Sequence, residues 1–97
     1  MGSLNNIQAF TPGTVQVVAY TGTSAASSNA FGTGTHLVRL VATTDCHIKF
    51  AGTPTATTSD MFLPAFTAEY FLAGEGEKVA AIQLSSGGNL NVTEMTK

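Results

Sequence analysis

Apolar residues in this chain occur in short runs of four to seven, and clusters of Gly, Pro, Asn or Thr separate these runs every eight to twelve residues. No window contains the apolar period of an amphipathic helix over eleven residues. Short runs with regularly spaced turn residues are typical of sandwiches and barrels. The pattern therefore predicts an all-β protein, an antiparallel β-sandwich of jelly-roll type with about eight short strands.

The expected strands coincide with the apolar runs. They are Ile7–Phe10, Val15–Tyr20, His36–Thr43, Cys46–Phe50, Met61–Leu63, Glu69–Leu72, Lys78–Leu84 and Leu90–Met95. Side chains alternate between the two faces of a strand, so Cys46 and Ile48 are expected to face the core and His47 to face away from it. The predicted core residues are Leu40, Cys46, Ile48, Phe50, Val79 or Ile82, Leu90 and Val92, and the aromatic residues Phe62, Phe66, Tyr70 and Phe71 are expected to make that half of the core heavier.

Turn residues predict the connections between these strands. Ser85–Gly88 is expected to close a hairpin that pairs residues 82–84 with residues 90–92, because Gly and Ser tolerate the backbone angles of short hairpin loops. Tight turns are also predicted at Thr11–Gly13 and at Gly74–Glu77. The segment Ser24–Gly34 is small and polar, which favours a flexible connection.

Length and composition limit the kind of protein this can be. The 97 residues make one β-sandwich domain, in which residues 1–6 are expected to form an N-terminal arm. Charged residues make up only 10% of the chain, against about 25% in ordinary soluble domains. A net charge of -2 argues against nucleic-acid binding, which depends on positive charge. One cysteine excludes an internal disulfide, and no run of eighteen apolar residues predicts a membrane span.

The only cluster of potentially reactive side chains is Asp45-Cys46-His47. In a strand, Cys46 and His47 point to opposite faces, so they cannot act together as nucleophile and base or as ligands of one metal. His36 is interpreted as a residue at the end of a strand, and Asn91-Val92-Thr93 as strand rather than as a used glycosylation site. We therefore expect no catalytic residue, no metal site and no cofactor, and a protein that is not an enzyme.

Two segments are candidates for binding a partner. Residues Leu37–Val41 are apolar on both faces and only Arg39 interrupts them, so this strand is expected to be covered on its second side as well. The Thr-rich loop Ala51–Asp60 is either a flexible surface loop or an arm that becomes ordered against a partner. The candidate binding residues are Leu37, Arg39, Val41, Thr53, Pro54, Thr55, Thr57 and Thr58. Low charge and exposed apolar strands predict self-association, with a trimer favoured.

The chain resembles small virion structural proteins of tailed bacteriophages, which decorate or cement the capsid or belong to its appendages. The likeness rests on four segments, Arg39–Phe50, Pro54–Asp60, Glu69–Phe71 and Gly76–Val79. It implies a β-sandwich or jelly-roll module without a cofactor. It also implies that copies bind the major capsid protein and stabilise the head, in a virion assembled in the bacterial cytoplasm. The alternatives are a carbohydrate-binding β-sandwich and an adhesion protein of the tail or another appendage.

Overall fold

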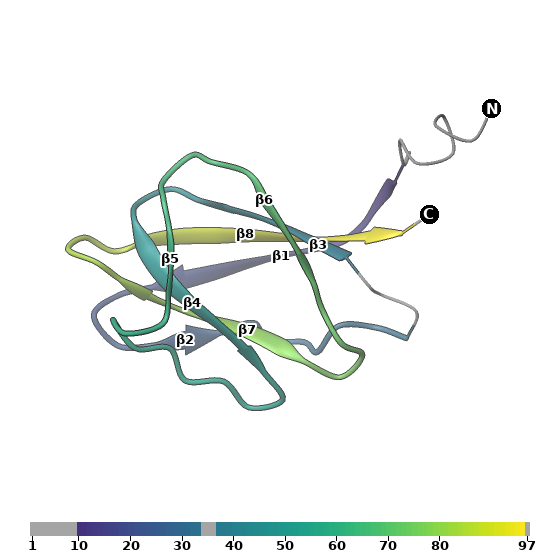
Figure 1. The fold of residues 1–97 in the computed structure, drawn as a ribbon, viewed down its shortest axis with the longest axis horizontal. Helices are drawn as coiled ribbons and strands as arrows, with labels where there is room; N and C mark the ends of the chain where they lie inside the picture. Colours follow the sequence, from purple (N-terminus) through teal and green to yellow (C-terminus); the bar gives the residue numbers. More distant parts are fainter. Residues whose placement is uncertain (1–9, 34–36, 97) are drawn as a thin grey trace.

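The computed structural model describes residues 10–33 and 37–96, and in this part of the chain the protein is all-β. Two antiparallel sheets of four strands form the β-sandwich that the sequence predicts (Figure 1). The strands are β1 (Thr11–Tyr20), β2 (Ala25–Ala26), β3 (Leu37–Ala42), β4 (Cys46–Ala51), β5 (Met61–Leu63), β6 (Glu69–Leu72), β7 (Lys78–Gln83) and β8 (Gly88–Thr96). Sheet A has the strand order β1-β8-β3-β6, and sheet B has the order β2-β7-β4-β5.

The pairing of the strands is nested, as in a long hairpin that has been rolled up. β1 pairs with β8, β2 with β7, β3 with β6, and β4 with β5. Two further pairings, β3 with β8 and β4 with β7, close the nested ribbon into the two sheets. This arrangement is the jelly roll that the sequence predicts.

The core lies between the two sheets and consists of the inward-facing residues of both. Six predicted core residues are fully or almost fully buried there: Leu40, Cys46, Ile48, Val79, Leu90 and Val92. Phe50 packs against this core while half-buried, and Val79 rather than Ile82 takes the inward position in β7. Alternation along each strand therefore predicted these core residues correctly, whereas Val18, Tyr20 and Phe31 belong to the same core and were not among the predicted residues.

The predicted hairpin between residues 82–84 and 90–92 is wrong. β7 belongs to sheet B and β8 to sheet A, so the connection between them crosses from one sheet to the other. Gly88 is needed there for a close approach, because a Cβ atom on it would lie 2.5 Å from Thr44 Oγ1 and 2.9 Å from the Tyr20 hydroxyl. A glycine is therefore required at position 88 because neighbouring hydroxyl groups leave no room for a side chain. The positive φ expected in this turn is found at Gly76 instead.

The N-terminal third of the described chain also differs from expectation. Thr11–Gly13 is part of β1, where the pairing with β8 shifts register between Pro12 and Val15, so it is not a turn. Of the expected strand Ile7–Phe10, Phe10 precedes β1 and the rest lies outside the described residues, as do His36 and residues 1–6. The Ser24–Gly34 segment, expected to be flexible, includes β2 and the buried Phe31, whose backbone N–H donates to Glu77 O at 2.8 Å.

Candidate functional site

The side chains of Asp45, Cys46 and His47 diverge, as strand geometry predicts. Cys46 is completely buried in the core, and burial raises the pKa of its thiol. The ring nitrogen Nδ1 of His47 lies on the other face and donates to the carbonyl oxygen of Asp60 at 2.9 Å. Asp45 Oδ1 accepts from the backbone N–H of Ala65 at 2.8 Å. Asp45 and His47 therefore hold neighbouring segments in place, Cys46 packs in the core, and the three groups do not form a common site.

The loop between β4 and β5 is packed onto the protein. Pro54 and Ala56 are buried, and the N–H of Ala56 donates to Ser24 Oγ at 2.8 Å. The Asp60 carboxylate accepts from the Thr57 N–H at 2.7 Å, and this bond lowers the pKa of Asp60. The predicted binding residues of this loop divide accordingly, since Pro54 is buried, whereas four threonines stay exposed: Thr53, Thr55, Thr57 and Thr58.

The three predicted binding residues of β3 lie elsewhere. Leu37, Arg39 and Val41 alternate with the buried Val38 and Leu40, so they are on the outer face of sheet A, where all three are half-buried by their neighbours. The β4–β5 loop belongs to sheet B and is fastened beside β2 at the edge of that sheet. The structure therefore divides the predicted binding residues between two separate surfaces.

The outer face of sheet A carries four of the exposed large hydrophobic residues, Val15, Val17, Tyr70 and Leu72. Its members alternate with inward-facing residues in all four strands: Val15, Val17 and Ala19 of β1, Asn89, Asn91, Thr93 and Met95 of β8, Leu37, Arg39 and Val41 of β3, and Tyr70 and Leu72 of β6. We call this set the sheet A face. Val15 and Val17 are more than half exposed, and Leu72 is 83% exposed. Arg39 is its one charged residue.

Register places the arginine at the centre of the sheet A face. Arg39 is paired with Thr93 on one side and with Tyr70 on the other, and Val15 follows Thr93 in the same row. Asn91 is in the central strand β8, half-buried, and its side-chain amide donates to Val41 O at 3.4 Å. The Asn91 sequon thus lies within a sheet rather than in an exposed loop. A surface of this composition can bind a partner by apolar contact with few ion pairs.

The aromatic residues near Pro64 contradict the expectation of a heavier core. Only Phe71 packs against the core, whereas Phe62 is 44% exposed, Tyr70 is 53% exposed and Phe66 is 76% exposed. Phe66 also has a positive φ of 56°, which is unusual for a bulky side chain. β5 is only three residues long and ends at Leu63, so Phe66 lies outside any strand, and Tyr70 of β6 lies on the outer face because it pairs with Arg39. Pro64, which directly follows β5, is the residue in the sequence that indicates the early end of this strand.

One buried acid was also missed. Glu94 is only 7% exposed, faces inward from β8 and accepts from the Gly32 N–H at 3.3 Å. Its position in the alternation of β8, two residues after the buried Val92, would have indicated this. Within residues 10–33 and 37–96 there is no pocket and no group of three potential metal ligands. The same residues form no helix that is long and apolar enough to span a membrane.

Comparison with known proteins adds no relative. No family model, no curated protein and no solved structure matches this chain. The sheet A face is therefore the feature on which a functional proposal rests.

Proposed function

We propose that this chain is a non-enzymatic structural protein that binds a larger assembly through the sheet A face. The observation that carries the proposal is the composition of that face, where exposed valines and Leu72 surround a single charge, Arg39. The resemblance of the sequence to virion proteins of tailed bacteriophages favours a capsid as the assembly. On this proposal the chain decorates the head, its partner is the major capsid protein, and its bound copies stabilise the shell.

The energetics of apolar burial support this use of the sheet A face. Burying a valine or leucine side chain completely contributes about 1.5–3 kcal/mol relative to leaving it in water. Val15, Val17 and Leu72 each keep more than half of their surface in water, so most of that free energy is still available to a contact. Such a contact needs a partner surface that is apolar and nearly flat, as the outside of a sheet requires.

The test is a pelleting assay in which the protein is mixed with undecorated capsid shells. Val17→Lys places a charge on the sheet A face and should weaken binding at least about tenfold, which corresponds to about 1.4 kcal/mol. Thr58→Lys is the matched control, because it adds the same charge to an exposed residue of the β4–β5 loop. Equal binding by Val17→Lys and the parent protein, or failure of the parent to pellet with shells, would contradict the proposal.

A carbohydrate-binding module is the second candidate, and the exposed aromatic rings favour it. Sugars bind on aromatic platforms, and Phe62, Phe66 and Tyr70 are all exposed. The backbone of Phe66, with its positive φ of 56°, is fixed to the end of β3 by the bond from its N–H to Ala42 O at 2.8 Å. Retention of the protein by a polysaccharide matrix, lost in Phe66→Ala and without binding to shells, would favour this function over the first.

A further inference from the structure

The sandwich has four strands at the edges of its sheets, and three of them are protected from pairing with another chain. Edge strands expose unpaired backbone groups, and proteins protect them by proline, irregular pairing or shortness. β1 contains Pro12 and a register shift, β2 has only two residues, and β5 has three. The side chain of Gln16 further holds β1 to the following loop, through bonds of 3.0 Å to Asn29 O and from Asn29 N.

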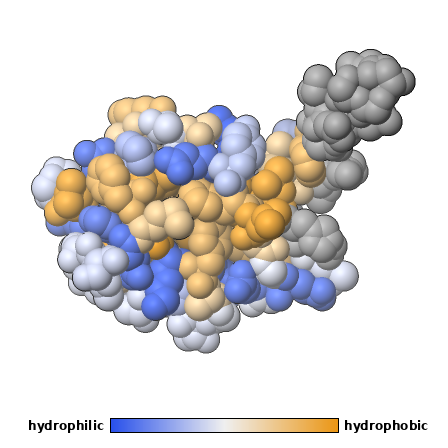
Figure 2. All heavy atoms as spheres, in the orientation of Figure 1, coloured by the Kyte–Doolittle hydropathy of each residue, from blue (hydrophilic) through white to orange (hydrophobic). Residues whose placement is uncertain are grey.

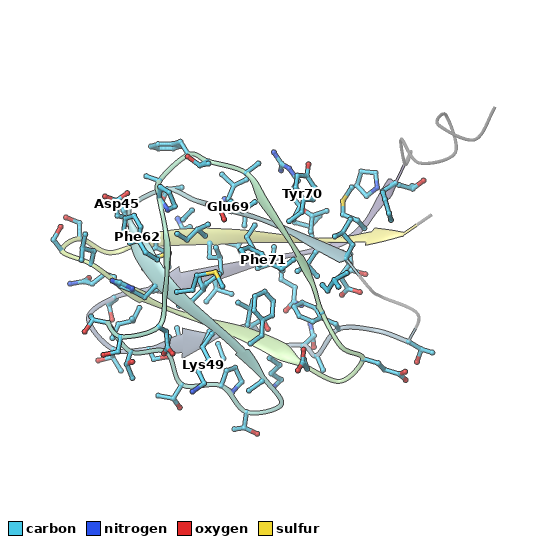
Figure 3. All side chains as sticks on the ribbon, in the orientation of Figure 1. Asp45, Lys49, Phe62, Glu69, Tyr70 and Phe71 are labelled. Carbon is cyan, nitrogen blue, oxygen red and sulfur yellow. The ribbon has the colours of Figure 1, made fainter. Side chains whose placement is uncertain are left out.

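The fourth edge strand, β6, is the least protected of the four, because it has four residues against two in β2 and three in β5, and it has neither the proline nor the register shift of β1. It is the last strand of sheet A, its pairing with β3 is regular over Glu69–Leu72, and it contains no proline and no lysine. β6 crosses the front of the molecule in Figure 1, and Figure 2 shows apolar atoms exposed along the middle of the same view. Figure 3 labels Phe71 there, half-buried and packed on Phe50 with ring centroids 5.5 Å apart.

We propose that β6 pairs with β6 of a second copy of this chain, antiparallel about a two-fold axis. An edge strand suits its own copy because two identical strands related by a two-fold axis are antiparallel, as the pairing in both sheets already is. Side chains on one face must pair with side chains on the same face, which limits the possible registers. Among these registers, the favoured one is the register that places compatible side chains opposite each other.

The register that places Phe71 opposite Phe71 of the partner subunit fits the side chains best. It aligns Tyr70 with Leu72 of the partner subunit, an apolar pair on the sheet A face, and covers the exposed side of Phe71. It also aligns Glu69 with Ala73 of the partner subunit, so the two glutamates do not face each other. The alternative register centred on Tyr70 would instead place Glu69 opposite Phe71 of the partner subunit.

This pairing would join the two copies of sheet A into one continuous sheet of eight strands. The two sheet A faces would then lie on the same side of the dimer. The inference uses the edge of β6, so it does not require the proposed capsid contact to be correct. It predicts a dimer where the sequence led us to expect a trimer.

Analytical ultracentrifugation at micromolar concentration tests the assembly. The parent should sediment at twice the 10.0 kDa chain mass. Leu72→Lys places a lysine at the β6 edge twice in each dimer and should weaken dimerisation at least about tenfold. Val17→Lys is the control, because it changes the same face at β1 and should leave the dimer intact. A monomeric or trimeric parent, or equal loss of the dimer in both variants, would overturn the inference.

Disulfide trapping tests the register. Tyr70→Cys and Leu72→Cys, mixed and oxidised, should form a crosslinked heterodimer, because paired residues of adjacent strands lie within disulfide distance. Each variant alone should stay uncrosslinked, and the native Cys46 is completely buried. A crosslink in Tyr70→Cys alone, or none in the mixture while the parent is dimeric, would overturn this register.

Discussion

Tyr20 is the residue that holds together the end of the sandwich where strands cross between sheets. It is 1% exposed, and its hydroxyl donates to Thr44 O at 2.7 Å and accepts from Thr44 N at 3.2 Å. Thr44 Oγ1 in turn donates to Ser86 O at 3.0 Å. This single phenol therefore connects β1 to the β3–β4 connection, and through Thr44 to the β7–β8 connection. Burial raises the pKa of Tyr20.

Tyr20→Phe should lower the free energy of unfolding at pH 7 by about 1–3 kcal/mol, because the Thr44 backbone groups lose their partner. The raised pKa means that folding favours the protonated phenol, and this contribution is complete below about pH 10 and lost as the pH rises further. The difference between parent and variant should therefore shrink above about pH 10. The Tyr20 hydroxyl also lowers the pKa of the Cys46 thiol, which burial raises, so the pH-dependent difference between parent and variant includes a contribution from Cys46.

Urea unfolding at several pH values measures this difference. Tyr70→Phe is the control. Tyr70 is exposed, so loss of its hydroxyl group should change the free energy of unfolding by no more than about 0.5 kcal/mol. Equal stability of Tyr20→Phe and the parent at pH 7 would show that the hydroxyl network contributes nothing. A difference that grows with pH would show that the sign of the titration is wrong.

The β4–β5 loop, which the sequence predicts to be a flexible loop or an arm for a partner, is packed onto the protein. A loop of this length costs little to shorten if it is free, because closure entropy varies slowly with length. Here the loop contains the buried Ala56, its bond to Ser24 Oγ, and the Asp60 carboxylate that caps Thr57. The loop is therefore part of the packed structure of sheet B.

Deletion of residues 55–58 should destabilise the protein by at least about 1 kcal/mol, since it removes both hydrogen bonds and the buried alanine. For a domain of this size, that loss corresponds to a decrease in Tm of about 4–8 °C. Thr58→Ala, which changes only an exposed side chain, should leave Tm nearly unchanged. Differential scanning calorimetry measures both, and an unchanged Tm in the deletion would show that the loop is energetically free.

At the scale of the whole molecule, the low charge determines how any assembly should respond to salt. Only ten charged residues are present, and Arg39 is the one on the sheet A face. At physiological salt the Debye length is about 8 Å, so added salt weakens contacts between exposed charges but not apolar contacts. Shell binding should therefore persist when the salt concentration in the pelleting assay is raised several-fold. Dissociation at moderate salt would identify a contact based on charge.

The class of fold, most strand positions and the division of side chains between two faces follow from local sequence patterns. Met61–Leu63 and Glu69–Leu72 were predicted with the observed bounds, and the inward positions of Cys46 and Ile48 are confirmed. These properties are local, because the two-residue period belongs to each strand whatever it pairs with. The two-sided apolar character of Leu37–Val41 likewise indicated the surface that carries the proposal.

Strand pairing and the covering of each face depend instead on contacts between distant parts of the chain. Ser85–Gly88 suits a hairpin and a crossing between sheets equally well, and the choice depends on β1 and β3, which are distant in sequence. Alternation likewise places Tyr70 and Phe71 on opposite faces of β6. The order of the strands then decides that the Tyr70 face is the outer one and that Phe71 packs on Phe50. Burial depends on what packs against a face, and that partner is supplied by a different part of the chain.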